Sequence, residues 1–121
     1  MVLSTDGNSP KIEVRGATKV YEAKTGPVHA LEDVSLQVSE GELMCILGPS
    51  GCGKSTLIRL MAGFERPSGG SITIDGKPIN GPGLDRLVVF QETALFPWMT
   101  TYENIMYGPR ARGSDNKEAR D

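Results

Sequence analysis

Nine residues near the middle of the chain have the composition of a loop that binds phosphate. The stretch GPSGCGKST, residues 48–56, combines three glycines with a lysine and the hydroxyl pair Ser55-Thr56. Glycines let consecutive backbone N–H groups turn toward an anion, because no Cβ obstructs the approach. A helix that begins at Lys54 would add its free first-turn N–H groups and the positive end of its dipole. The pattern GxxxxGK[ST] therefore predicts a site for nucleotide phosphates.

Each residue type in this loop has a predicted task. Lys54 supplies a mobile positive charge for the β and γ phosphates, and Ser55 is placed to ligate Mg²⁺. Thr56 is expected to donate a hydrogen bond to an α-phosphate oxygen. The alternative, a flexible glycine loop with an incidental lysine, is disfavoured by the apolar run before the loop and the helical pattern after it. The residues predicted to contact the nucleotide are Gly48, Pro49, Ser50, Gly51, Cys52, Gly53, Lys54, Ser55 and Thr56.

Apolar patterning predicts the elements that position the loop. The continuous apolar run 43–47 is typical of a strand covered on both faces. Apolar side chains spaced three and four residues apart predict a helix from Lys54 that Gly63 caps. Thr100 and Glu103 have the spacing of a capping box, which opens a second helix that Gly108-Pro109 should end. Further strands are expected at 12–15, 19–21, 31–38, 71–74 and 87–90.

Composition limits the classes of protein. With 121 residues, one domain is expected, and the net charge of -2 gives no reason to expect a nucleic-acid partner. The sequence shows neither a secretion signal nor an apolar run long enough to span a membrane, so a soluble cytosolic chain is expected. Cys45 and Cys52 have no metal-ligand spacing and are expected to be reduced thiols.

Two longer stretches carry a resemblance to a known family. ALEDVSLQVSEGELMCILGPSGCGKSTLIRLMAGFERPSGGSITIDGKPI is similar to the N-terminal half of the nucleotide-binding subunit of ATP-binding cassette (ABC) transporters. LVVFQETALFPWMTTYENIMYG resembles the Q-loop of that family and the segment after it. The resemblance implies an α/β fold, a P-loop NTPase core with an N-terminal antiparallel β subdomain, truncated before the helical subdomain. The expected organisation is a disordered tail at 1–10, the N-terminal part of the ATP-binding domain at 11–110 and a polar end at 111–121 that starts the helical subdomain.

The resemblance also assigns two residues outside the loop. Tyr21 occupies the place of the aromatic side chain that stacks on adenine, and a plain strand tyrosine is the alternative. Gln91 matches the Q-loop glutamine, which reaches Mg²⁺ and the attacking water. Lys54 and Gln91 are thereby the expected catalytic residues, and Ser55 and Gln91 the expected metal ligands.

The family implies partners as well as ligands. GPGLDRLVVFQ and LFPW resemble importers of nitrate, sulfonate, taurine and related solutes. ATP with Mg²⁺, a transmembrane permease subunit and a second nucleotide-binding subunit are the implied partners. The implied location is the inner face of the plasma membrane, reached through the permease. The apolar residues 95–99 lie where that family meets its membrane subunit, and both a partner surface and a buried core stay open for them.

Several features of the family's second half are absent from this sequence. It contains no LSGGQ signature, no Asp-Glu pair after an apolar strand, no D-loop and no switch histidine, so ATP binding without turnover is expected. Another P-loop enzyme, such as a small nucleotide kinase, and a non-catalytic nucleotide-binding fragment are the alternatives. His29 is expected to be a surface residue, and both PSGGS at 67–71 and Asp75 are expected to lie in turns.

Overall fold

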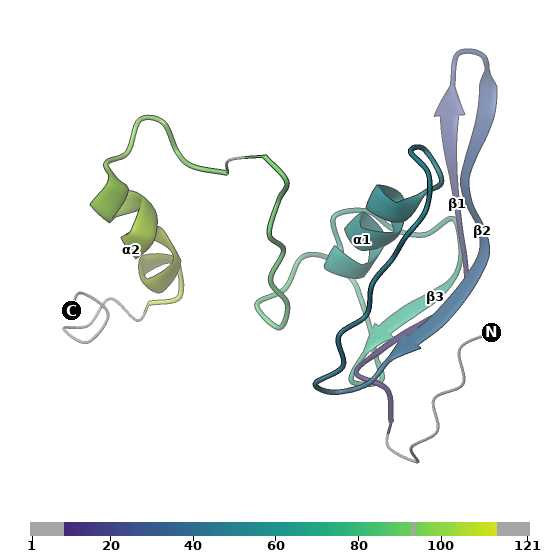
Figure 1. Cartoon of the computed structure of the whole chain (residues 1–121), viewed down its shortest axis with the longest axis horizontal. Coiled ribbons are helices and arrows are strands. Elements are labelled where there is room, and N and C mark those ends of the chain that lie inside the picture. The colour runs from purple at the N-terminus through teal and green to yellow at the C-terminus, as the bar shows by residue number, and fades with distance from the viewer. Residues whose placement is uncertain (1–8, 93, 114–121) are drawn as a thin grey trace. The chain divides into compact units, whose positions relative to one another are not determined.

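The computed structural model describes residues 9–92 and 94–113 and divides into two compact units, with the boundary between Leu87 and Val88. The first unit contains a four-stranded antiparallel sheet in the order β2-β1-β3-β4 and one helix, α1. Figure 1 shows α1 beside the strands of this sheet. The bounds are β1 Ile12–Ala23, β2 Gly26–Val38, α1 Lys54–Ala62, β3 Gly69–Ile74 and β4 Lys77–Pro78.

The two strands expected at 12–15 and 19–21 are one long strand, β1. The register of β1 against β2 shifts between Val14 and Val20, so the strand continues through an irregular middle. Gly16 has a φ of 55° in this region, and its N–H donates to Ser35 Oγ at 2.8 Å. A bulge of this kind bends a strand without ending it, which periodicity read from the sequence does not reveal.

The hydrophobic core lies between α1 and the sheet. Leu57 and Leu60 of α1 are buried, and both belong to one cluster with residues of three strands. The helix ends as expected, because Gly63 takes the left-handed conformation and its N–H donates to Leu60 O at 3.0 Å. The cluster consists of Val14, Ala17, Leu31, Leu57, Leu60 and Ile72.

The hairpin between β3 and β4 confirms the predicted turn. Asp75 and Gly76 have φ values of 49° and 74°, which is the conformation that a two-residue hairpin turn requires. Asp75 also accepts a hydrogen bond from Lys11 Nζ at 3.0 Å. The prediction of a turn at residues 67–71 was wrong in its extent, since only Ser68 lies in a bend and β3 begins at Gly69.

The apolar segment 43–47 is not a strand covered on both faces, which corrects the prediction. Its side chains alternate, with Met44 and Ile46 partly buried and Leu43, Cys45 and Leu47 exposed. Ile46 packs against the core cluster, whereas Leu43 and Leu47 are each 90% exposed. One face is therefore covered and the other is open, and within the described residues no strand is assigned to this segment.

The second unit contains the helix α2, Thr101–Ala111. Its predicted capping box is confirmed, because Glu103 N–H donates to Thr100 Oγ1 at 3.2 Å and Thr100 N–H donates to Glu103 Oε2 at 2.7 Å. The helix does not end at Gly108-Pro109 as predicted. Pro109 lies inside its last turn, where a proline removes one backbone donor close to a helix end.

Two expectations about other segments have different outcomes. The strand predicted at 87–90 is not formed, and Leu87 and Val89 are more than 80% exposed. Among the described helices, neither is long and apolar enough to cross a membrane. The predicted bounds of the tail, the central part and the polar end stay predictions, and residues 1–8 and 114–121 of the two ends lie outside the described residues.

The core around α1 gives a prediction for stability. Leu60 is 1% exposed, so Leu60→Ala should lower the free energy of unfolding by about 2–5 kcal/mol, through lost apolar burial and a residual cavity. Ile58→Ala is the matched control on the same helix. Because Ile58 is 44% exposed, this substitution should lower the free energy of unfolding by less than about 1 kcal/mol. Urea unfolding followed by far-UV circular dichroism measures both. Equal losses would contradict the assigned helix face.

Candidate functional site

The predicted phosphate loop leads directly into α1. Gly53 is the N-cap of the helix, with a φ of 95°, and Leu57 N–H donates to Gly53 O at 2.9 Å. A Cβ at Gly53 would lie 2.5 Å from Ala30 O and 2.7 Å from Leu31 Cδ2, both on β2. Only glycine therefore fits where the loop crosses the strand, and this close approach fixes the start of the helix.

Lys54 folds back over the loop that precedes it. Its Nζ donates to Gly48 O at 2.7 Å and to Pro49 O at 2.6 Å, and it lies 3.5 Å from Cys52 Sγ. Three groups of the loop thus surround one ammonium group. A phosphate oxygen that entered the loop would replace carbonyl oxygens as the partner of this charge, and a charge-assisted bond to phosphate is the stronger of the two.

The start of α1 offers hydrogen-bond donors and hydroxyl groups to a ligand. No side chain caps the N-terminus of α1, so the helix dipole and its first-turn N–H groups act on whatever occupies the loop. Ser55 is exposed and Thr56 is half-buried, and both lie in this first turn. A hydroxyl at the rim of a phosphate site fits a Mg²⁺ ion that also binds phosphate oxygens. The residues present therefore fit MgATP, with Ser55 as the predicted metal ligand in this unit.

Tyr21 lies near the end of β1 within a group of charged residues. Its hydroxyl donates to Glu65 Oε2 at 2.6 Å, and Lys19 Nζ lies 5.0 Å from the centre of its ring. This hydrogen bond to Glu65 raises the pKa of Tyr21, and the Thr56 side chain acts in the opposite direction. Tyr21 and Thr56, both predicted from the sequence to contact the nucleotide, are thus brought together.

Glu65 and Lys19 were missed by the sequence reasoning. Glu65 follows the cap of α1, and 44 positions separate it from Tyr21. No local pattern marks such a distant contact, whereas Lys19 lies only two residues before Tyr21. The pKa of Glu65 is lowered, first by the Tyr21 hydrogen bond and then by Lys19 and Arg59.

The remaining predicted residues have separate outcomes. Gln91 is exposed and belongs to the second unit, so its approach to the loop and to Mg²⁺ stays a prediction. His29 is exposed as predicted, and its Nδ1 lies 3.2 Å from Glu32 Oε1. Cys45 and Cys52 are both free thiols, but Cys45 is exposed rather than buried, because its side chain points to the open face of residues 43–47.

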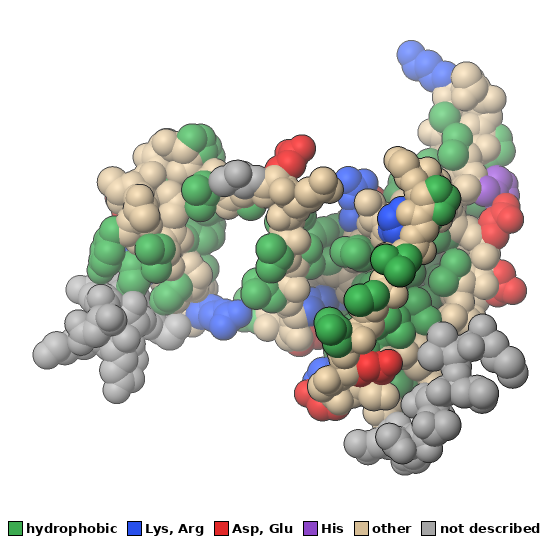
Figure 2. Space-filling view, viewed as in Figure 1, with side chains coloured by type: hydrophobic (Ala, Val, Ile, Leu, Met, Phe, Trp, Pro, Cys, Tyr) green, Lys and Arg blue, Asp and Glu red, His purple; other side chains and the backbone are tan. Residues whose placement is uncertain are grey.

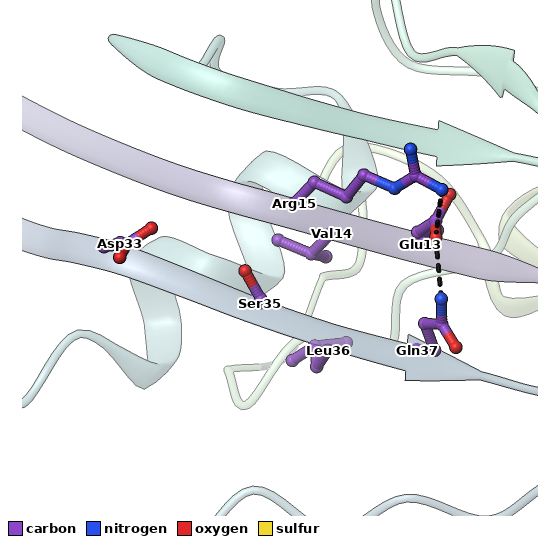
Figure 3. A pocket seen from close by; sticks show the side chains of 7 residues that line it. All are labelled: Glu13, Val14, Arg15, Asp33, Ser35, Leu36 and Gln37. Carbon is purple, nitrogen blue, oxygen red and sulfur yellow. Dashed lines mark hydrogen bonds and ion pairs between the residues drawn. The ribbon is translucent and has the colours of Figure 1, made fainter. Parts of the chain in front are cut away.

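A polar depression lies over β1 and β2, and the sequence predicted no role for it. Its volume is about 540 Å³, and Figure 3 shows the residues that line it. Two of its three charged side chains are paired, since Glu13 Oε1 lies 2.9 Å from Arg15 Nη2 and accepts from Gln37 Nε2 at 2.7 Å, and Asp33 is the third. The Ser35 hydroxyl accepts the Gly16 N–H. These contacts stabilise the bulged strand pair and give no indication of a ligand.

In the second unit, residues 95–99 form an apolar surface next to α2. Trp98 is 76% exposed and Leu95 63% exposed, whereas Phe96 stacks at 4.6 Å on Tyr107. Asn104 holds this segment, because its Oδ1 accepts from Phe96 N–H at 2.8 Å and its Nδ2 donates to Thr100 O at 2.9 Å. Hydrophobic side chains are visible at the surface of both units in Figure 2. The segment is thus partly core of its own unit and partly exposed.

Comparison with known sequences places the chain in a family. The model of the ABC transporter family matches residues 31–121. The bicarbonate transport ATP-binding protein CmpD of Synechococcus elongatus is 46% identical over 123 residues, which cover 98% of this chain and 44% of that protein. The taurine import ATP-binding protein TauB of Burkholderia pseudomallei is 48% identical over 103 residues, or 85% of this chain and 40% of that protein. The chain thus spans less than half the length of these curated relatives.

Solved structures give the same assignment for the fold. The ATP-binding cassette MJ0796, solved as a dimer bound to ADP and Pi, is 32% identical and superposes with a TM-score of 0.75. The match covers 90% of this chain and 52% of that one. The predicted fold class is therefore confirmed: an α/β P-loop NTPase core with an N-terminal antiparallel β subdomain.

The two thiols give a test of the loop as a nucleotide site. Cys52 Sγ lies 3.5 Å from Lys54 Nζ within the loop, so MgATP bound there should slow alkylation of Cys52 by iodoacetamide. Cys45 is exposed outside the loop and should react at the same rate with and without MgATP. Mass spectrometry after brief exposure measures each thiol separately. Alkylation of Cys52 at an unchanged rate in saturating MgATP would show that nucleotide does not enter the loop.

Proposed function

Because the chain belongs to the ABC transporter family, we propose that it is the ATP-binding part of an importer subunit that binds MgATP to power solute uptake. The observation that carries this proposal is the loop itself, in which Lys54 lies over residues 48–52 at the start of an uncapped helix. In this role Lys54 binds the β and γ phosphates, Ser55 ligates Mg²⁺ and Thr56 binds the α phosphate. Backbone N–H groups of the loop surround the phosphates.

The base of the nucleotide has its own proposed contact. Tyr21 is proposed to stack on adenine because it occupies the family's position for the stacking aromatic side chain, and the effect on its pKa of Thr56, in the first turn of α1, supports this role. Stacking of a base on an aromatic side chain contributes about 1–3 kcal/mol. Gln91 is proposed as the residue that reaches Mg²⁺ and the attacking water, on the ground of its place in the sequence after residues 87–90.

The proposed partners follow from the family. A transmembrane permease subunit and a second nucleotide-binding subunit are proposed, with the chain at the inner face of the plasma membrane. The names of the bicarbonate and taurine relatives support an importer of a small solute. The exposed part of residues 95–99, Trp98 and Leu95 above all, is proposed as the surface that meets the permease.

Removing the loop cation tests MgATP binding directly. Lys54→Ala should weaken binding of a fluorescent ATP analogue by about 10- to 100-fold, because a charge-assisted contact with phosphate is lost. The fold should be retained, since the Lys54 ammonium contacts the loop rather than the core. Lys77→Ala on β4 is the control, because Lys77 is an exposed cation outside the loop. Equal affinity of the Lys54→Ala and Lys77→Ala chains would refute the phosphate-loop proposal.

We expect this chain to bind MgATP without hydrolysing it. The 121 residues contain no Asp-Glu pair after an apolar strand and no LSGGQ signature, so we expect no phosphate release from MgATP above background. A phosphate-release assay with the Lys54→Ala chain as the blank measures this. Steady release that disappears in Lys54→Ala would show a complete hydrolytic site, and transfer of phosphate to a nucleoside monophosphate would favour the kinase alternative.

A further inference from the structure

The hydroxyl group of Tyr21 is anchored by a residue that follows α1. Tyr21 donates to Glu65 Oε2 at 2.6 Å, which is a short bond to a charged acceptor. Such bonds are about twice as strong as bonds between neutral groups. The Tyr21 side chain is therefore held at both ends: its Cα belongs to the backbone of β1, and its hydroxyl is bonded to Glu65.

Lys19 restricts the same ring from one side. Lys19 and Tyr21 are two residues apart on β1, and the Lys19 ammonium lies over the Tyr21 ring. Lys19 Nζ lies 5.0 Å from the centre of the Tyr21 ring and 3.4 Å from Glu65 Oε2, and it donates to Arg66 O at 2.9 Å. A base that stacks on Tyr21 must therefore use the ring face that Lys19 does not cover.

The charge of Glu65 is balanced by its neighbours. Lys19 lies 3.4 Å and Arg59 Nη1 3.8 Å from its carboxylate oxygens. The side chains of Lys19 and Glu65 are only 16% and 24% exposed, so this contact is partly shielded from solvent. A carboxylate paired with two cations adds little net negative charge near a polyphosphate, which makes it acceptable beside a nucleotide.

We propose that Glu65 is a positioning residue for the nucleotide base: it holds the Tyr21 hydroxyl so that the ring is already oriented for stacking before the nucleotide arrives. The inference rests on the proposed function, in which Tyr21 stacks on adenine. An unanchored tyrosine must be ordered when the ligand binds, and ordering a side chain lowers affinity. Glu65 removes that cost without contacting the nucleotide.

Two ligands separate the base from the phosphates in the test. Isothermal titration of the 121-residue chain compares MgATP with magnesium tripolyphosphate, which has no base. Glu65→Ala should weaken MgATP binding by roughly 2- to 10-fold and leave tripolyphosphate binding unchanged. Glu65→Gln should retain most of the affinity for MgATP, because its amide oxygen still accepts the Tyr21 hydrogen bond.

A double-mutant cycle tests whether Glu65 acts through Tyr21. Tyr21→Phe removes the hydroxyl and keeps the ring, so it should weaken MgATP binding about as much as Glu65→Ala. The double variant Tyr21→Phe with Glu65→Ala should bind no more weakly than either single variant. Additive losses would mean that Glu65 acts independently of Tyr21, and the proposal would be wrong.

Tyr21→Ala distinguishes failure of this proposal from failure of the proposed function. If Tyr21→Ala weakens MgATP binding and Glu65→Ala does not, stacking stands and positioning by Glu65 is refuted. If Tyr21→Ala has no effect, stacking itself is refuted, and positioning with it. Equal weakening of MgATP and tripolyphosphate by Glu65→Ala would also overturn the proposal. Glu65→Gln and Tyr21→Phe keep the test valid if Glu65→Ala does not fold, which circular dichroism reports.

Discussion

The close contact between Gly53 and β2 is the constraint on which the rest of the site depends. A Cβ at this position would lie 2.5 Å from Ala30 O, so the chain can cross the strand here only as glycine. Immediately after this crossing α1 begins, and its buried residues Leu57 and Leu60 join the core cluster of the sheet. The core therefore fixes the helix, and with it the direction of the free N–H groups in its first turn. A binding loop that looks flexible from its glycines is held by packing on its far side.

The features that were predicted correctly from the sequence are those made by neighbouring residues. The helix after the loop, its Gly63 cap, the turn at Asp75-Gly76 and the capping box of Thr100 with Glu103 all depend on contacts within a few positions. Residue type and spacing carry that information completely. The nucleotide-binding role of residues 48–56 rests on neighbouring residues as well, but it stays a prediction.

Apart from the end of α2, which passes Gly108-Pro109, the features that were missed depend on neighbours distant in the sequence. A continuous apolar run at 43–47 indicates that side chains avoid water, but it does not identify what covers them, and here only the side of Ile46 is covered. The pairing of Tyr21 with Glu65 across 44 positions has no local signature either. The bulge at Gly16 joined two predicted strands into one, because it depends on the Ser35 hydroxyl of the neighbouring strand. Local patterns therefore predict the start and caps of a helix correctly, but they do not predict which distant residues pack around it.

The helix α1 connects the phosphate loop with Glu65, the residue that bonds to Tyr21. The loop with Lys54 lies at the N-terminus of α1, and Glu65, which anchors Tyr21, follows its C-terminus. A helix of nine residues is about 13 Å long. The loop and Glu65 therefore lie at opposite ends of one rigid element of that length. Lys54 already bonds to carbonyl oxygens of its own loop, so the proposed phosphate binding would be an exchange of partners with a modest net gain. In the proposed site, an aromatic ring held in place beforehand would add affinity that the loop cation alone does not supply, and it would distinguish a nucleotide from free polyphosphate.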